Sequence, residues 1–530
     1  MPTLTIDGRQ IESPEGSTVI QAAEKLGVFV PRYCYHPGLS IAGNCRICLV
    51  EVEKNPKLQI ACNTPVAEGM VVHTKNAKVE EGRRSVLEFL LANHPLDCPV
   101  CDQSGECDLQ NFYMNFGLYD PRFREQKVKK KKAVAVGPHV MLDQERCILC
   151  SRCERFTDEI SKTGEFGIFQ RGDRAQVGLY PGQQLDNRYS ANVVDICPVG
   201  ALTERDFRFK ARVWYLSSAP TVCNGCAQGC NVDIHYVLDR PHLNDGARIL
   251  RLKPRYNEHV NQWWMCDEGR YGFGWVDKGR LKKVRHQGRD ATWEQAIAAI
   301  AAELDQIRQN GTGSTLGVMA STQLTNEELF LVREIFQGVL GARVAVSGPR
   351  PPGDSDDFLI KADKNPNTHG AALVGLSDHS APTSASIIDD AVQGRLEALW
   401  VFGHDLTTLA DEKTLEELSR RLRLFVFSGT NDNPTVRWSH WVLPTSAYVE
   451  KDGTFVNSRG RVQRIGVAFP PLPNSREDWS VLLEIARQLN HPLAWRNPQE
   501  IFQAMAQTLA PFAGLTYDAL ASQGAGAATP

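Results

Sequence analysis

The sequence predicts a multidomain chain in which small α+β domains rich in cysteine precede an α/β domain with a parallel sheet. The 530 residues are enough for three or four domains. All 15 cysteines lie between Cys34 and Cys266, in short clusters. From about residue 290, segments with helical and strand periodicity alternate, as is typical of a parallel sheet covered by helices.

Composition excludes several classes of function. With a net charge of −3, the chain has no strongly basic domain, which argues against a nucleic acid partner. No signal peptide pattern opens the sequence, and no apolar run approaches the roughly 18 residues of a membrane span. We therefore expect a cytoplasmic protein that reaches a membrane only through partners. In that reducing compartment, clustered cysteines bind metal more often than they form disulfides.

The first set of cysteines has gaps of 10, 2 and 13 residues: Cys34, Cys45, Cys48 and Cys62. A close pair between two distant cysteines is the general plan of a ferredoxin-type two-iron site. A hairpin around Asp7-Gly8, a helix over 17–26 and a strand over 48–53 are predicted nearby. Gly43 is expected to let the backbone approach the cluster. Zinc or buried free thiols are the alternatives.

The second set follows a predicted amphipathic helix over 78–93, which Pro95 terminates. It consists of four soft or borderline ligands within 14 residues: His94, Cys98, Cys101 and Cys107. These ligands predict a metal site. Their chemistry does not separate zinc from an iron–sulfur cluster, because three cysteines and a histidine also suit zinc.

The third set is a C-x2-C-x2-C run with a remote Cys-Pro: Cys147, Cys150, Cys153 and Cys197. This spacing indicates a four-iron cluster. In the related bacterial run a further cysteine ligates a second cluster, but position 157 is Thr here. A single-cluster site with Cys197 as its fourth ligand is the simpler interpretation.

The fourth set has gaps of 2, 3 and 35 residues: Cys223, Cys226, Cys230 and Cys266. Its spacing fits an iron–sulfur cluster or a zinc ribbon. The four sets together use all 15 cysteines and His94. No cysteine is left for a catalytic thiolate or a redox disulfide, and we expect no catalytic residue on this chain.

Downstream, the alternating pattern predicts four helices. One begins at a Thr292/Gln295 capping box, and the others lie over 326–341, near 411–422 and near 475–489. Buried strands are predicted over 316–321, 398–403 and 424–429. The basic run at 127–132 is interpreted as a solvated linker rather than a docking patch. No dinucleotide or nucleoside triphosphate motif and no nucleophile elbow occurs, so nothing local places NADH, flavin or ATP on the chain.

Four motifs then identify a resemblance. PRYCYHPGLSIAGNCRICLVEVE, NHPLDCPVCDQSGECDLQ, DQERCILCSRCERF and DICPVGAL occur in one order within residues 1–270. Together they resemble the large iron–sulfur subunit of NADH-quinone oxidoreductase, which is respiratory complex I. Beyond residue 270, VLPTSAYVEKDGTFVNSRGRVQ (442–463) resembles a stretch of the molybdopterin oxidoreductases.

The resemblance implies one 2Fe-2S cluster at the first set and 4Fe-4S clusters at the second, third and fourth sets. It makes His94 the histidine ligand of the second set, and a neutral ligand there should raise that cluster's reduction potential. The implied domains are a two-iron ferredoxin domain (1–77), a His/Cys four-iron domain (78–125), a four-iron ferredoxin-like domain (126–215), a four-iron domain of molybdopterin-oxidoreductase type (216–275), a degenerate α/β molybdopterin-oxidoreductase-like domain (276–515) and a disordered tail (516–530).

The implied function is to relay electrons from a flavin- and NADH-binding subunit, through these clusters, to a ferredoxin-like subunit and on to quinone. The chain would be part of NADH:quinone oxidoreductase with other peripheral-arm subunits, on the cytoplasmic face of the bacterial inner membrane and without inserting into it.

Departures from the resemblance keep other functions in view. The chain ends soon after the helix near 475–489, and no cysteine is left to bind molybdenum, so we expect a truncated domain without molybdopterin. One alternative is the electron-transfer subunit of a soluble NAD-linked formate dehydrogenase or hydrogenase. Another is a structural zinc-binding scaffold.

Overall fold

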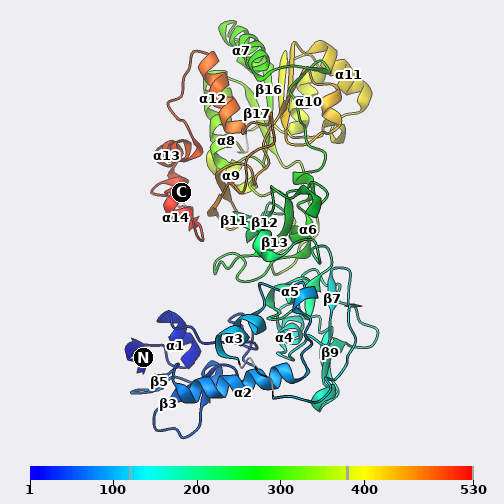
Figure 1. Cartoon of the computed structure of the whole chain (residues 1–530). Helices are drawn as coiled ribbons and strands as arrows, with labels where there is room; N and C mark the ends of the chain where they lie inside the picture. Colours follow the sequence, from blue (N-terminus) through cyan, green and yellow to red (C-terminus); the bar gives the residue numbers. More distant parts are fainter. Residues whose placement is uncertain (118–119, 121, 378–380, 528–530) are drawn as a thin grey trace. The chain divides into compact units, whose positions relative to one another are not determined.

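A computed structural model describes residues 1–117, 120, 122–377 and 381–527 of the chain. They form two compact units, Met1–Leu216 and Ser217–Pro530 (Figure 1). The division lies one residue from the predicted domain boundary between residues 215 and 216, and each unit is described by itself. No helix within the described ranges is both long enough and apolar enough to cross a bilayer.

The N-terminal unit contains three sheets, ordered β2-β1-β5-β3-β4, β10-β7-β6 and β8-β9. Its strands are β1 (Thr3–Ile6), β2 (Arg9–Glu12), β3 (Leu49–Val52), β4 (Gln59–Ile60), β5 (Val71–His73), β6 (Val134–Ala135), β7 (Val140–Leu142), β8 (Phe166–Phe169), β9 (Gln176–Leu179) and β10 (Leu202–Glu204). Its helices are α1 (Val19–Lys25), η1 (Ala61–Asn63), α2 (Ala77–Asn93), η2 (Cys98–Val100), α3 (Asp108–Phe116), α4 (Arg152–Glu159), η3 (Gly172–Arg174), α5 (Asn192–Ile196) and η4 (Val213–Tyr215).

The local predictions for this unit are confirmed. β1 and β2 pair antiparallel around Asp7 and Gly8, which both have positive φ (46° and 80°), as a tight hairpin requires. Helix α1 begins after Thr18, whose capping box with Gln21 is present. Helix α2 ends at Asn93, directly before His94 and Pro95.

The C-terminal unit contains a seven-stranded sheet, β15-β14-β20-β19-β18-β16-β17, and two three-stranded sheets, β11-β12-β13 and β21-β22-β23. Its strands are β11 (Ser217–Val222), β12 (Asn231–Tyr236), β13 (Ile249–Pro254), β14 (Arg285–His286), β15 (Arg289–Asp290), β16 (Leu316–Ser321), β17 (Arg343–Ser347), β18 (Ala398–Phe402), β19 (Leu424–Gly429), β20 (Trp441–Pro444), β21 (Gly453–Val456), β22 (Arg461–Ile465) and β23 (Ala525–Gly526). Its helices are η5 (Pro241–Leu243), α6 (Asp267–Tyr271), η6 (Gly274–Val276), α7 (Trp293–Gln309), η7 (Gly313–Thr315), α8 (Asn326–Val332), η8 (Arg333–Val339), α9 (Thr368–Val374), α10 (Ser384–Val392), η9 (Leu406–Thr408), α11 (Glu412–Arg421), η10 (Pro434–Arg437), α12 (Asp478–Gln488), α13 (Pro498–Thr508), η11 (Ala510–Phe512) and α14 (Tyr517–Leu520).

The predicted parallel sheet with helices on both faces is confirmed. Strands β17, β16, β18, β19 and β20 run parallel in that order. Side chains alternate between two cores because successive residues of a strand point to opposite faces. Trp400 and Val426 join the core that holds α7, α8 and α12, while Val401 and Phe427 join the core that holds α10 and α11 (Figure 1).

The helix predicted over 326–341 is confirmed, but it changes type along its length. It is α-helical as far as Val332 and continues as the π-helix η8, and Leu340 N–H donates to Ile335 O five residues back (3.0 Å). One prediction for this unit is wrong. The tail expected to be disordered from residue 516 contains α14 and β23, and β23 pairs with β22. The last three residues of that tail lie outside the described residues.

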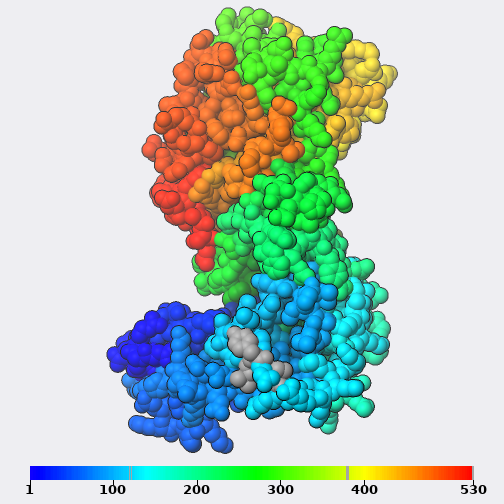
Figure 2. Space-filling model, viewed as in Figure 1, coloured from blue at the N-terminus to red at the C-terminus, as the bar shows by residue number. Residues whose placement is uncertain are grey.

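The tail is held by burial. The side chains of Tyr517 and Leu520 are each 2% exposed, and the Tyr517 hydroxyl donates to Glu327 Oε1 at 2.8 Å. Figure 2 shows the red C-terminal segment against the orange part of its own unit. A local sequence pattern rich in Gly and Ala suggests disorder, but these two apolar anchors provide the buried area that orders it.

The tail's contribution to stability is testable. Leu520→Ala should lower the free energy of unfolding by about 2–4 kcal/mol, because it removes a buried side chain and leaves a cavity. Leu409→Ala, at a side chain 41% exposed, is the matched control and should change stability by less than about 0.5 kcal/mol. Denaturant unfolding measures both, and equal effects would contradict the packed tail.

Candidate metal centres

The first set of cysteines is gathered by the loop between α1 and β3 and by η1. Cys34 N–H points at the sulfur of Cys45, 3.4 Å away. Hydrogen bonds with the Cys45 and Cys62 thiols lower the pKa of Cys34, and a bond with Cys62 lowers that of Cys48. The four thiols are therefore neighbours. Gly43 has a φ of +63°, and a Cβ there would meet Ile60 at 3.3 Å; its close approach to a bound cluster stays a prediction.

The second set lies where α2, η2 and α3 meet. His94 follows the last residue of α2, and Cys107 precedes the first residue of α3. Burial lowers the pKa of His94 to about 4 and raises that of Cys107 to about 11. The Nδ1 atom of His94 is buried and has no hydrogen-bond partner among the described residues. A neutral imidazole with an unpartnered nitrogen is the form that binds a metal.

The basic run at 127–132 packs against the second set and is not a solvated linker. Lys127 Nζ donates to the carbonyls of Leu91 and Ala92 (2.7 and 2.9 Å), at the end of α2. Lys132 Nζ pairs with Asp97 at 2.5 Å and Glu145 at 2.8 Å. After burial, the charges of Lys127 and Arg146 are the next causes of the lowered His94 pKa. The segment thus places positive charge around His94, which its sequence alone did not reveal.

The third set lines a closed, mainly apolar cavity. All four of its cysteines face this cavity, together with Ile148, Val177 and Val199. Leu149 and Ser151 adopt left-handed backbone (φ 55° and 58°), and Leu149 N–H points at Cys147 Sγ from 3.4 Å. Burial raises the pKa of Cys150 and Cys197 to about 11. Neutral thiols are readily buried, and a metal that converts them to thiolates would make these four convergent cysteines its ligands.

The fourth set joins the β11–β12 loop to the start of α6. Gly225 N–H points at Cys223 Sγ and Gly269 N–H at Cys266 Sγ, each from 3.4 Å. A Cβ on Gly269 would lie 2.9 Å from Cys223 Sγ, so this glycine permits the close approach. Burial raises the pKa of Cys223 to about 11 and that of Cys266 to about 12.

Two arginines of α4 connect the first and third sets. Arg155 donates to the carbonyls of Cys34 (2.6 Å) and Cys150 (3.3 Å), one from each set. Arg152 donates to Tyr35 O (2.7 Å) and to Ile196 O (2.8 Å), beside Cys197. Cysteine spacing gives no sign of this role, although both arginines stand within the CILCSRCERF motif.

A short segment after Cys197 connects the third set to the second. Cys107 Sγ lies 3.9 Å from Pro198 O, and a Cβ on Gly200 would lie 2.2 Å from Cys101 Sγ. Val199 lines the cavity of the third set. Three consecutive residues therefore touch two sets of ligands.

Each predicted set is therefore brought together in part or in full. Within the described ranges, no three His, Cys, Asp or Glu side chains converge tightly enough to hold a single metal ion. In the second set, Cys101 lies within electrostatic reach of Cys98 and of Cys107.

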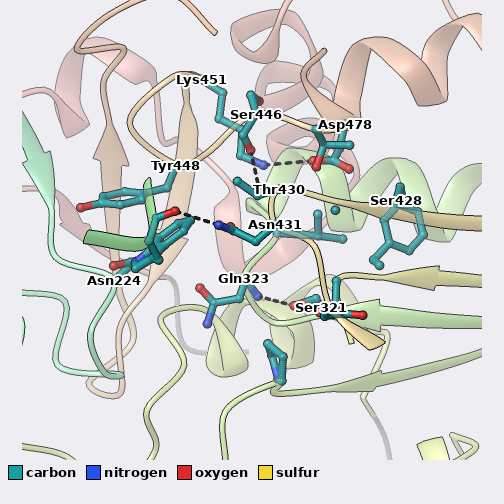
Figure 3. Close-up of a pocket in the computed structure, with 18 of the residues that line it drawn as sticks. Asn224, Ser321, Gln323, Ser428, Thr430, Asn431, Ser446, Tyr448, Lys451 and Asp478 are labelled. Carbon is teal, nitrogen blue, oxygen red and sulfur yellow. Dashed lines mark hydrogen bonds and ion pairs between the residues drawn. The ribbon is translucent and has the colours of Figure 1, made fainter. Parts of the chain in front are cut away.

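A further cavity of about 270 Å³ lies in the C-terminal unit. We call it the strand-end cavity, because Ser321, Phe402, Ser428 and Thr445 line it at or just beyond the ends of β16, β18, β19 and β20. Figure 3 shows Asn224 and Tyr448 on one side of it and Asp478 on the other, with Thr430 and Asn431 between.

Four family profiles match successive parts of the chain. They are a 2Fe-2S iron–sulfur cluster binding domain (residues 1–77), the iron–sulfur binding region of NADH-ubiquinone oxidoreductase-G (83–122), the ferredoxin-like domain of NADH-quinone oxidoreductase subunit 3 (137–203) and molybdopterin oxidoreductase (360–488). The first three matched regions contain the first, second and third sets.

Known relatives match most of the chain. The mitochondrial 78 kDa subunit of NADH-ubiquinone oxidoreductase from Candida albicans is 31% identical over 93% of this chain and 83% of its own. The Neurospora crassa counterpart is 30% identical over 95% and 83%. The G subunit of NADH-quinone oxidoreductase from Rickettsia bellii is 40% identical over 64%, and the match spans about half (48%) of that relative. A chain of an NAD+-reducing [NiFe]-hydrogenase matches 40% of this chain and 91% of its own at 30% identity, with a TM-score of 0.34, too low to support an argument.

The close contact between Gly200 and Cys101 gives a test of the second set. Gly200→Ala should displace Cys101 and remove about four iron atoms per chain, the content of one four-iron cluster. Gly274→Ala is the matched control, because a Cβ there meets no atom within 4 Å. Iron analysis and EPR spectroscopy of anaerobically purified protein distinguish the two, and full iron content in Gly200→Ala would refute the contact's importance.

Proposed function

The chain belongs to the family of the large iron–sulfur subunit of respiratory complex I, and from that premise we propose that it carries single electrons from an NADH-oxidising flavin subunit towards quinone. The observation that supports this most is the use of its cysteines. All 15 stand in four sets, and 14 of them are buried or half-buried. Iron–sulfur clusters, when bound, supply one-electron carriers.

The proposed ligands are the four sets named above. Cys34, Cys45, Cys48 and Cys62 would hold a two-iron cluster; His94, Cys98, Cys101 and Cys107, then Cys147, Cys150, Cys153 and Cys197, and finally Cys223, Cys226, Cys230 and Cys266 would hold four-iron clusters. The residues present fit such groups. Backbone N–H groups point at sulfurs in the first, third and fourth sets, as clusters require.

The contacts support an order among the sets of the N-terminal unit. Arg155 ties the first set to the third, and the segment Pro198–Gly200 ties the third to the second. We therefore place the third set between the first and the second along the path.

We propose that electrons leave this chain from the second set. Cys98 is the one exposed cysteine of the 15, all of which the structure describes. Leu96 and Val100, which flank it in sequence, are 90% and 62% exposed. Exposed apolar side chains next to a redox ligand suit a docking partner, and a ferredoxin-like subunit of the complex is the proposed one. The other proposed partners are the flavin subunit and further peripheral-arm subunits, on the cytoplasmic side of the bacterial inner membrane.

No substrate reaction is assigned to this chain, although residues 360–488 match the molybdopterin oxidoreductases. The strand-end cavity, at about 270 Å³, is at the small end of ligand sites, which span roughly 300–1,000 Å³, and a pterin dinucleotide needs much more room than it offers. Lys451 and Asp478 pair across part of its lining at 3.4 Å. The residues do not fit that cofactor, and we derive no step through it.

Electrostatics of the basic run give the test of the relay. Lys132→Gln should lower the reduction potential of the second cluster, because it removes a positive charge, leaves Glu145 without its ion-pair partner and leaves Asp97 paired with Arg146 alone. Lys131→Gln is the matched control, since the Lys131 side chain is exposed and forms no ion pair within the described part of the chain. Redox titration followed by EPR measures both; equal potentials in the two variants would contradict this role.

A further inference from the structure

We propose that the strand-end cavity binds a small aromatic anion of about the size of a nucleoside monophosphate. The proposal goes beyond electron relay and does not depend on which metal the cysteines hold. It rests on the position of the cavity in the sheet, on two buried donors without partners, and on an aromatic wall.

The position of the cavity is the first argument. Its floor follows the carboxyl ends of four neighbouring parallel strands, β16, β18, β19 and β20. Ligands of open α/β sheets bind outside these strand ends. The cavity is also lined by Asn224, in the loop of the fourth set, and by Arg350 and Tyr448. The fold therefore builds a site here with walls from several distant segments.

Two donors at the cavity have no partner. Arg350 Nε and Ser446 Oγ are buried and form no hydrogen bond within the described residues. Arg350 is held in place on its other side, where a terminal N–H donates to Asn224 O. Among the acidic groups whose charges act on Arg350, the thiols of Cys223 and Cys226 come first, ahead of Glu268 and Asp363. Glu268 pairs with Lys364 at 2.9 Å, and Asp363 accepts from Asn365 N–H at 2.9 Å. A buried donor without a partner is costly, and the oxygens of an anion bound in the cavity would be acceptors for these two donors.

Lys451, the other cationic side chain that lines the cavity, is already paired, which favours Arg350 as the anion-binding cation. Lys451 Nζ contacts both oxygens of Glu328 (2.8 and 2.7 Å), and its charge is compensated there. The amide of Asn431 donates to Trp275 O (2.8 Å) and Lys278 O (2.6 Å).

Aromatic side chains at the cavity would contact the ring of the ligand. Trp275 and Tyr448 stack with ring centroids 5.9 Å apart and planes at 30°, and Phe402 lines the cavity as well. Flat apolar surfaces beside hydroxyl and amide groups suit a planar ring with polar edges. The cavity volume of about 270 Å³ suits a single nucleotide rather than a dinucleotide.

Calorimetric titration of the anaerobically purified full chain tests the proposal. AMP and nicotinate are the probes, because they carry a phosphate and a carboxylate respectively on a planar ring. Binding of either supports the proposal and identifies the anionic group. Adenosine, which lacks the anion, should bind at least about tenfold more weakly than AMP, since a charged hydrogen bond is lost. Absence of binding by both anions would overturn the proposal.

Two variants test the residues. Ser446→Ala should weaken binding about tenfold while leaving the unliganded chain as stable as before or more stable, because its hydroxyl has no partner to lose. Arg350→Gln should weaken binding more. Arg420→Gln, at a side chain 73% exposed on α11, is the matched control. Binding unchanged in both Ser446→Ala and Arg350→Gln would contradict the site, and iron content, measured in parallel, separates this result from damage to the fourth set.

Discussion

The burial of sulfur is the constraint on which the rest of the structure depends. Of 15 cysteines, only Cys98 is exposed. In the third and fourth sets, burial raises the pKa of every thiol for which a shift is resolved. Such thiols become useful ligands only if a metal compensates their negative charge. The glycines, the left-handed residues and the backbone N–H groups around them are the means by which the chain supports that charge.

Cationic side chains from other segments then connect the sets. Arg152 and Arg155 join the loops of the first and third sets through backbone carbonyls, and Arg212 donates to the carbonyls of Pro99 (2.6 Å) and Cys101 in the second. Because these bonds end on the backbone, they fix the distance between loops without competing for sulfur. A relay needs such rigidity, since its sites must keep their spacing while charge passes.

Local patterns in the sequence predicted most helices and strands, but they did not predict the long-range contacts. The Thr292/Gln295 capping box and strand 316–321 depend on neighbouring residues, and the structure has both as expected. The packing of Lys132 on Asp97 and Glu145 and the anchoring of Tyr517 on Glu327 depend on tertiary contacts that no periodicity reports. The cysteine spacing grouped the ligands, but it did not reveal that Pro198–Gly200 touches two sets.

Metal content per chain tests the central claim most directly. The account predicts about 14 iron atoms in anaerobically purified protein, from one two-iron and three four-iron clusters, and no molybdenum. A count of about 10 iron atoms with one zinc would contradict the assignment of one four-iron cluster, because the set concerned would then be a structural zinc site. Stoichiometric molybdenum or tungsten would contradict the relay itself, because the chain would then carry a catalytic centre.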